Sequence, residues 1–317
     1  MKTAFYLSLL FNLFIGSIAA MEDEHKNAVI EWDADFYDQN SNSQFEGGKA
    51  FVDQIDLSQA SGFLDVGCGT GRMALYLASK YPDLRIVGYD ASGNMIKKAH
   101  EKLVQAQGQN LNIDFFQADA SRFQFGHPQF SHAFSYAVFH FIVNQLQALK
   151  NIATGLQDGG ALYIMTAANN NSYQFGHAFI ETVQDKKWVN FFPANLDVKS
   201  LANLVTKEEL IEKFKQAGFV NIDVKEVTRQ RQYDSKETFI NFLLGWIIGL
   251  PIVTKFTPEE RRLFVEDAVS RYLEKVPLLD GKYTYILPSL AAKAQIKRDE
   301  SGKIISEDLL SGHVVDV

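Results

Sequence analysis

A glycine-rich loop is the segment of this chain whose residue types are best suited to ligand chemistry. In FLDVGCGTGRMA, residues 63–74, Gly67 and Gly69 directly follow a short apolar run. Glycines in such a loop let the backbone approach a nucleotide-like ligand closely. The loop alone leaves open whether that ligand is a dinucleotide, an ATP phosphate or a compound without phosphate.

Two phosphate-binding motifs do not fit this loop. A P-loop continues as Gly-Lys-Ser/Thr, whereas Arg72 and Met73 follow Gly71 here. The dinucleotide motif GxGxxG would place its third glycine at Arg72. Asp65, two residues before Gly67, would repel a pyrophosphate and attract an ammonium group. We therefore expect a ligand that carries a cation near the loop.

Two further aspartates extend this pattern. Asp90 lies twenty-three residues after Gly67, where an acidic side chain accepts hydrogen bonds from both hydroxyls of a ribose. Asp119 is placed to accept one from an exocyclic amine such as adenine N6. Each aspartate alone is equally well interpreted as a solvated loop residue. Partners for an ammonium group, a ribose and an adenine together describe S-adenosylmethionine.

The elements that position these residues follow from the apolar pattern after residue 62. Strands that alternate with helices predict a parallel sheet with helices on both faces, and ligands bind at the carboxyl ends of its strands. The expected strands are 62–67, 84–90, 112–119, 132–138 and 161–167, and the expected helices are 72–81, 92–107 and 144–156.

Capping-box sequences mark two helices of the second half, which begin at Thr206 and Thr257 and end before Gly218 and near Lys275. Between them, residues 219–233 alternate well enough for one or two strands.

The apolar run 236–250 is short and stops at Pro251, which favours a buried helix over a membrane span. Residues 283–294 predict a last strand, and the polar residues 297–310 are expected to be loose.

Four ordered segments resemble the motifs of class I S-adenosylmethionine-dependent methyltransferases. They are FLDVGCGTGRMALYLASKYP, IVGYDASGNMIKKAHEKL, FFQADASRFQF and LQDGGALYIM. Within that superfamily the chain is most similar to the trans-aconitate and insect juvenile hormone acid methyltransferases, which methylate carboxylates of small molecules. The resemblance is close over 62–167 and looser beyond. It implies a doubly wound, mostly parallel, seven-stranded α/β sheet with a helical lid, S-adenosylmethionine as cofactor, and a small-molecule methyl acceptor.

The resemblance also implies site residues. Those for the cofactor are Asp65, Gly67, Cys68, Gly69, Asp90, Ala91, Asp119, Ala120 and Ser135, and those for the acceptor are Gln44, Phe141 and Trp246. Phe141 stands where the family usually has Trp, so an aromatic wall is kept and an indole donor is lost. That departure weakens the carboxylate inference and leaves the cofactor inference intact. Gln44 has a solvated loop residue as its alternative interpretation, and the two aromatic residues have the core as theirs.

Methyl transfer from a sulfonium is an in-line displacement, in which the protein aligns the reactants and excludes water. A carboxylate is already ionised at neutral pH and needs no general base. If the acceptor were a hydroxyl or an amine, His140 is the candidate catalytic base, with a structural histidine as the alternative.

Composition narrows the partners. The net charge of −7 and the lack of a dense Lys/Arg run disfavour nucleic acid. The scattered histidines predict no metal site. Cys68 is the one cysteine, so no internal disulfide is possible, and we expect its side chain to pack.

Residues 1–20 have a different character. Lys2 precedes an apolar stretch that closes on small residues, the pattern of a secretory signal peptide. Alternatively, translation begins at Met21, before the polar MEDEHKN. The compartment stays open: exported with a true leader, cytoplasmic with the later start.

We expect one methyltransferase domain over 21–295, with a cofactor core at about 45–168, a lid and C-terminal strands at about 169–295, and a polar tail over 296–317. Two other classes of function remain open. A dehydrogenase is disfavoured by Asp65. A methyltransferase-like protein that only binds its ligand gains weight if the leader is real, because S-adenosylmethionine is an intracellular metabolite.

Overall fold

The computed structural model describes residues 31–106, 111–170, 172–192, 202–247, 253 and 256–305. The predicted leader 1–20, the alternative start at Met21 and the last part of the predicted tail, 306–317, lie outside the described residues.

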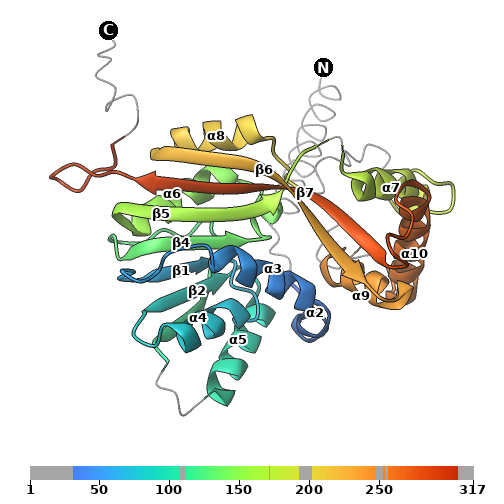
Figure 1. Cartoon of the computed structure of the whole chain (residues 1–317), viewed down its shortest axis with the longest axis horizontal. Coiled ribbons are helices and arrows are strands. Elements are labelled where there is room, and N and C mark those ends of the chain that lie inside the picture. The colour runs from blue at the N-terminus through green and yellow to red at the C-terminus, as the bar shows by residue number, and fades with distance from the viewer. Residues whose placement is uncertain are drawn as a thin grey trace, which may run out of the picture. The chain divides into compact units, whose positions relative to one another are not determined.

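The described strands form one seven-stranded sheet in the order β3-β2-β1-β4-β5-β7-β6 (Figure 1). Strands β1 to β5 are parallel, and β7 runs antiparallel to both β5 and β6. Their bounds are β1 Phe63–Val66, β2 Ile86–Asp90, β3 Ile113–Gln117, β4 Phe130–Tyr136, β5 Leu156–Ala167, β6 Phe219–Tyr233 and β7 Tyr283–Ile296. The prediction of a mostly parallel α/β sheet is confirmed, and residues 219–233 form one strand.

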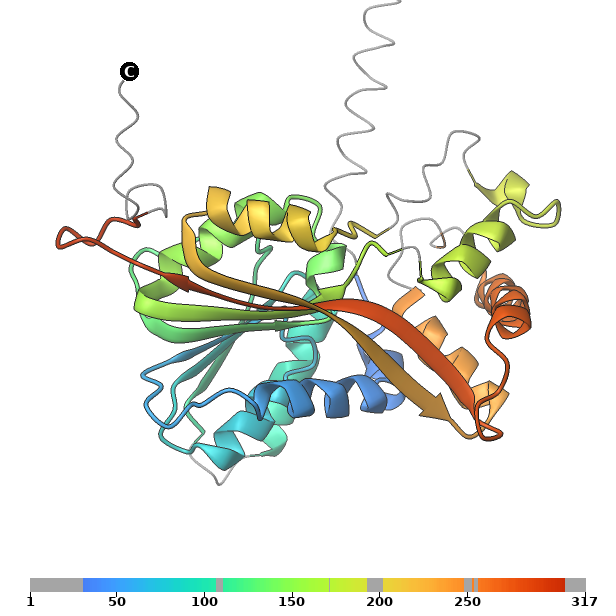
Figure 2. The same cartoon turned by 45° about the horizontal axis from the view of Figure 1, so that its top comes forward.

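Helices cover both faces of the sheet (Figure 2). Helices α3, α4 and α5 lie on one face, and α6 and α8 lie on the other. Their bounds are α3 Asn42–Val52, α4 Arg72–Lys80, α5 Gly93–Gln105, α6 Gln145–Gly155 and α8 Lys207–Gln216. The short α2, Ala34–Asn40, precedes them, and the predicted capping box of Thr206 is formed at the start of α8.

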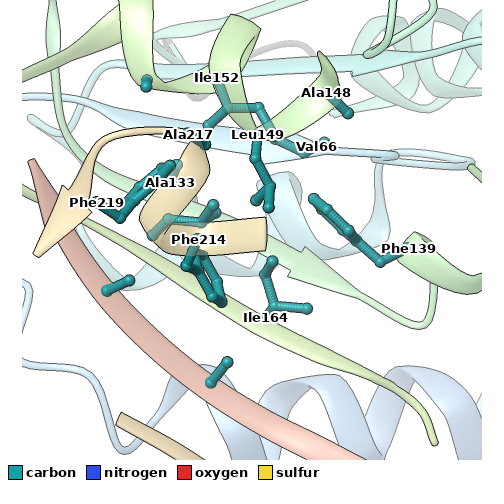
Figure 3. Packing of buried hydrophobic residues seen from close by; sticks show 14 of the residues in the cluster. Val66, Ala133, Phe139, Ala148, Leu149, Ile152, Ile164, Phe214, Ala217 and Phe219 are labelled. Atoms are coloured by element: carbon teal, nitrogen blue, oxygen red, sulfur yellow. The ribbon is translucent and has the colours of Figure 1, made fainter. Parts of the chain in front are cut away.

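Apolar packing between the sheet and α6 and α8 builds the core of one face (Figure 3). Ile164 of β5 is fully buried there, as are Leu149 of α6 and Phe214 of α8. Each such side chain contributes about 2 kcal/mol by leaving water. This packing fixes the carboxyl ends of the strands, where the predicted ligand residues lie.

A two-stranded arm extends beyond the sheet (Figures 1 and 2). β5 pairs with β7 only over 289–295, whereas β6 pairs with β7 as far as Tyr233 and Tyr283. We call residues 228–233 and 283–288 the β6–β7 arm. A second apolar cluster joins this arm to three helices, α7 Gln174–Val183, α9 Lys236–Ile247 and α10 Pro258–Lys275.

Helix α9 contains most of the apolar run that raised the membrane question. Phe239, Leu243 and Ile247 of this helix are fully buried in the second cluster. Within the described residues, no helix is long and apolar enough to cross a membrane. Burial in the second cluster therefore accounts for the apolar character of α9.

Residues 297–305 differ from the sequence-based expectation of a loose segment. Arg298 and Ile304 form an isolated antiparallel bridge. The Arg298 guanidinium donates to the carbonyls of Ala153 and Leu156, at the end of α6 and the start of β5. A polar composition concealed this anchoring, because one half-buried arginine satisfies several carbonyls at once.

Candidate functional site

The glycine loop joins β1 to α4 and presses against the turn that follows β4. Gly67 has a φ of +73°, and a Cβ added there would lie 2.4 Å from Cγ2 of Val138. A side chain at this position would meet both backbone strain and a collision. The backbone therefore passes close to the turn at Ala137 and Val138, and Ala137 lines the cavity described below.

Asp65 is the third residue of β1 and is 3% exposed. Its Oδ2 atom has no hydrogen-bond partner among the described residues. Burial, and secondarily the charge of Asp90, raise the pKa of this carboxyl to about 7. A buried carboxyl without a cation is costly, so this position is prepared for a positively charged group.

Asp90 ends β2, next to the glycine loop. Its Oδ2 accepts from the Gly69 N–H at 3.0 Å, and its Oδ1 accepts from the Ser92 N–H at 2.9 Å. Burial raises the pKa of this carboxyl, and these backbone hydrogen bonds partly offset the shift. Each carboxylate oxygen keeps lone-pair capacity for a further donor, as the ribose role requires.

Asp119 lies two residues beyond β3. Its Oδ1 accepts from both the backbone N–H and the hydroxyl of Ser121, each at 2.8 Å. Its Oδ2 lies 3.6 Å from Nε of Arg122. These contacts fix the orientation of Asp119 at the same edge of the sheet as Asp90.

The remaining predicted cofactor residues lie in and around this edge. The carbonyl of Ala91 accepts from Gln117, and that of buried Ala120 accepts from Asn151. Cys68 is buried, which raises the pKa of its thiol. The hydroxyl of Ser135 donates to the Val66 carbonyl at 3.0 Å. Ser135 thus links β4 to β1 and keeps no hydroxyl proton for a ligand.

A segment that the sequence analysis missed is tied to this edge at two points. The Glu31 carboxylate accepts from the Ser92 hydroxyl at 2.9 Å and from the Gly93 N–H at 3.1 Å, at the start of α5. Asp38 accepts from Thr70 of the glycine loop at 2.7 Å and pairs with Lys102.

Aromatic side chains of the same segment face the site. A Cβ added at Gly69 would have the Tyr37 ring as its nearest neighbour. The charge of Asp90 helps to raise the pKa of the Tyr37 hydroxyl. Trp32 packs edge-on against Phe141 at 5.4 Å between ring centroids. The sequence analysis gave these residues no site role, because the contacts of this segment are with chain more than 30 positions away.

A cavity of about 300 Å³ lies beside the turn at Ala137. One part of its wall is aromatic, from Phe175, Phe179 and Phe242. Its polar groups come mainly from Gln44, His140, Asn169, Asn170, Arg229 and Arg231. Among the described residues that line it, there is no Asp or Glu. The cavity is therefore lined by both apolar and positively charged groups.

The register of the β6–β7 arm explains why both arginines reach this cavity. Arg229 pairs with Leu287 and Arg231 pairs with Tyr285. Residues two apart on a strand share a face, so these four side chains line the cavity together. The alternation TRQRQY is equally typical of a solvated strand. Only the helices packed around the arm distinguish the two interpretations.

Arg229 is held in a fixed orientation without a carboxylate. Its Nε donates to the Ser289 hydroxyl at 2.7 Å, and its Nη1 donates to the Tyr136 hydroxyl at 3.0 Å. Its buried Nη2 atom has no partner among the described residues. Burial lowers the pKa of this guanidinium. An unpaired, buried cation beside a cavity is prepared for an anion.

His140 also lines the cavity, within the 3₁₀ helix η1 Phe139–Phe141. Its Nδ1 lies 3.1 Å from the Thr166 hydroxyl and 3.4 Å from the Ala167 backbone nitrogen. Burial, with a smaller contribution from the charge of Arg229, lowers the pKa of the ring to about 3.

Of the three predicted acceptor residues, Gln44 and Phe141 line the cavity. The side chain of Trp246 lies outside the described part of the chain. The hydroxyls of Tyr173 and Tyr285 lie 2.7 Å apart in the wall. Burial raises the pKa of both phenols, that of Tyr173 to about 12, so neither is a base at neutral pH.

Comparisons with known proteins agree with this architecture. Residues 63–160 match the family model described as a methyltransferase domain. The chain is 24% identical over 262 residues to the trans-aconitate 2-methyltransferase of Afipia carboxidovorans, with 82% of this chain and 97% of that protein covered. It is 27% identical over 179 residues to the malonyl-(acyl-carrier protein) O-methyltransferase of a Paenibacillus species, covering 56% and 62%.

A solved structure also shares the fold. It is phosphoethanolamine N-methyltransferase 2 of Haemonchus contortus in complex with S-adenosyl-L-methionine, with a TM-score of 0.54 and 18% identity. The match covers 84% of this chain and 57% of that chain.

Proposed function

Since this chain carries a class I S-adenosylmethionine-dependent methyltransferase domain related to the trans-aconitate group, we propose that it methylates a carboxylate of a small molecule. The observation that carries the acceptor class is Arg229, which lines a mainly apolar cavity and whose buried Nη2 has no partner within the described part of the chain.

The edge of the sheet that carries Asp65, Asp90 and Asp119, which we call the cofactor edge, supplies groups that fit S-adenosylmethionine. We propose that Asp65 binds the ammonium group, since its buried Oδ2 lacks a partner. Asp90 is then placed for the ribose hydroxyls, and Asp119 with Ala120 for the adenine. Gly67 and Gly69 permit close backbone approach. When bound, the cofactor supplies an electrophilic methyl group on a sulfonium.

The acceptor cavity supplies orientation and not proton transfer. A carboxylate is ionised at neutral pH, so its oxygen attacks without a general base. Arg229 would bind the carboxylate and hold it in line with the methyl group. Phe141 and the aromatic wall would exclude water. The ester product is neutral, so Arg229 loses its ionic partner after transfer, which favours product release.

The β6–β7 arm with α7, α9 and α10 serves in this proposal as the helical lid. Phe175 and Phe179 of α7 and Phe242 of α9 line the cavity. They add apolar surface to the cavity that Arg229 and Arg231 also line, and the Arg231 guanidinium lies over the Phe242 ring. An acid with an apolar body therefore matches the cavity better than a compact, fully polar acid does.

A transfer assay tests the acceptor class. The full chain is incubated with methyl-labelled S-adenosylmethionine and each of trans-aconitate, decanoate and phosphoethanolamine. We expect label in a base-labile methyl ester of at least one carboxylic acid. Label on the amine of phosphoethanolamine and in no acid would refute a carboxylate acceptor while leaving methyl transfer itself intact.

An arginine variant tests the carrying observation. Arg229→Met keeps the length of the side chain and removes the charge. Losing a hydrogen bond to a charged group costs about 1.5–3 kcal/mol, so kcat/KM for the acid should fall roughly 10- to 100-fold. Arg262→Met, on the exposed side of α10, is the matched control. Unchanged kinetics in Arg229→Met would remove the basis of the proposal.

A further inference from the structure

The hydrogen bonds of His140 define the protonation of its ring. The Ala167 N–H points to Nδ1, and the Thr166 hydroxyl lies within hydrogen-bond distance of the same atom. A backbone N–H only donates, so Nδ1 is the acceptor and carries no proton. The proton of the neutral ring therefore sits on Nε2.

Nε2 has no hydrogen-bond partner among the described residues, and His140 lines the cavity. The ring faces the same space as Arg229, whose charge acts on it. Two elements thus bring donors to the cavity: η1 brings His140, and β6 brings Arg229, whose buried Nη2 has no partner among the described residues.

The surroundings of the ring oppose a second proton. Burial and Arg229 hold the pKa of His140 near 3. No carboxylate among the described cavity-lining residues offsets that cation, and the other charged or titratable groups there are Arg231, Tyr173, His177 and Tyr285. The ring lone pair is occupied at Nδ1, and the nitrogen left for a ligand already carries a proton, so His140 is unsuited to the general-base role considered from the sequence.

We propose that His140 donates its Nε2–H to the carboxylate of the methyl acceptor, beside the guanidinium of Arg229, and so determines specificity for an acid. This inference rests on the proposed carboxylate function. The two donors form a divided anion site: Arg229 supplies charge, and His140 supplies a neutral, directional hydrogen bond. One oxygen of the carboxylate is thereby oriented while the charge is balanced.

The tautomer is tested first, without any ligand. ¹⁵N spectra of histidine-labelled full chain, assigned by the signal missing in His140→Gln, should show a protonated Nε2 and an unprotonated Nδ1 from pH 5 to pH 9. A proton on Nδ1, or titration of the ring between pH 5 and pH 8, would overturn the inference.

Binding tests the role itself. Decanoate and its primary amide are titrated by calorimetry into full chain saturated with S-adenosylhomocysteine. His140→Leu keeps the volume and removes the donor, and we expect about 10-fold weaker binding of the acid with about 3-fold or less for the amide, because hydrogen bonds to an anion are the stronger ones. His140→Gln, which again offers an N–H, should recover most of the loss.

The outcomes separate this inference from the proposed function. If the acid binds and Arg229→Met abolishes its binding while His140→Leu does not weaken it, the role of His140 is wrong and the carboxylate function stands. If the wild-type chain binds S-adenosylhomocysteine but no acid, both are wrong. If His140→Leu does not fold, His140→Gln and the ring spectra decide between these outcomes. If adding decanoate did not shift the Nε2 proton signal, the proposed contact would be contradicted.

Discussion

The cofactor edge and the acceptor cavity each contain a buried ionisable group with an unpaired atom, and the two groups have opposite charge. Among the residues that the structure describes, Asp65 Oδ2 and Arg229 Nη2 have no hydrogen-bond partner. Asp65 lies in a four-residue strand beside its own glycine loop. Arg229 is instead positioned by residues 60 and 93 positions away along the chain.

This contrast is the basis of our proposal that the protein has two sites for two different ligands. An unpaired buried charge destabilises the empty fold, and a ligand of opposite charge relieves that cost. The cofactor edge is prepared for a cation and the cavity for an anion. Changes at one site should therefore leave the other site's binding intact, and this independence is what the following predictions test.

The largest effect is expected from Asp65→Asn. Removing one partner of a buried charge pair costs about 3–5 kcal/mol, so binding of S-adenosylmethionine should weaken at least 100-fold. Calorimetry on the full chain measures this loss, and NAD serves as a ligand that should not bind in either form. Unaltered affinity would show that another group holds the ammonium.

The second effect concerns how the stability of the fold depends on pH. The pKa of Asp65 rises from 3.8 to about 7 on folding. The unfolded carboxyl ionises first as pH rises, so this residue stabilises the fold most below pH 4 and loses that contribution, about 4 kcal/mol, by pH 7. Thermal melts from pH 4 to pH 8 should show a shallower decline in Asp65→Asn than in wild type. Parallel profiles would contradict the assigned pKa.

A third effect is expected in the empty cavity. Arg229→Met replaces an unpaired buried cation with an apolar side chain of similar length, so the free energy of unfolding should rise by about 1 kcal/mol even though acid binding is lost. Chemical denaturation measures the change. Destabilisation instead would mean that the hydrogen bonds to Tyr136 and Ser289 outweigh the cost of the charge.

The smallest effect concerns the segment over the cofactor edge. Glu31→Gln weakens the contacts of Glu31 with the start of α5, where a negative charge is worth about 0.3–1 kcal/mol. We expect S-adenosylhomocysteine to dissociate a few-fold faster in stopped-flow measurements, with decanoate affinity unchanged. Glu208→Gln, in the first turn of α8, is the matched control. An equal change in both variants would deny the segment any role at the site.

Sequence patterns were sufficient to predict the strands and helices of the parallel half of the molecule. The apolar run that contains Asp65 became β1, the run that ends in Asp90 became β2, and the capping boxes at Thr206 and Thr257 became the starts of α8 and α10. These signals are local: a strand, its loop and its helix lie within a few tens of residues, so period and capping chemistry determine them.

The acceptor cavity was less predictable. Gln44 and Phe141 were chosen by resemblance, and both line the cavity. Arg229 and Arg231 were missed, because alternating Arg and Gln predicts a solvated strand as readily as a buried one. His140 was singled out as a possible base, whereas its contacts with Thr166 and Ala167 place its one free N–H toward the cavity.

The sequence by itself determined the sheet, the glycine loop and the acidic cofactor edge, because each depends on residues close together in the chain. Tertiary structure alone decided the electrostatic character of the acceptor cavity. The β6–β7 arm turns Arg229 and Arg231 inward only through its register with β7 and the helices packed around it. Cross-strand register and burial by distant helices leave no local pattern in the sequence, so the same residues are equally compatible with a strand that faces water.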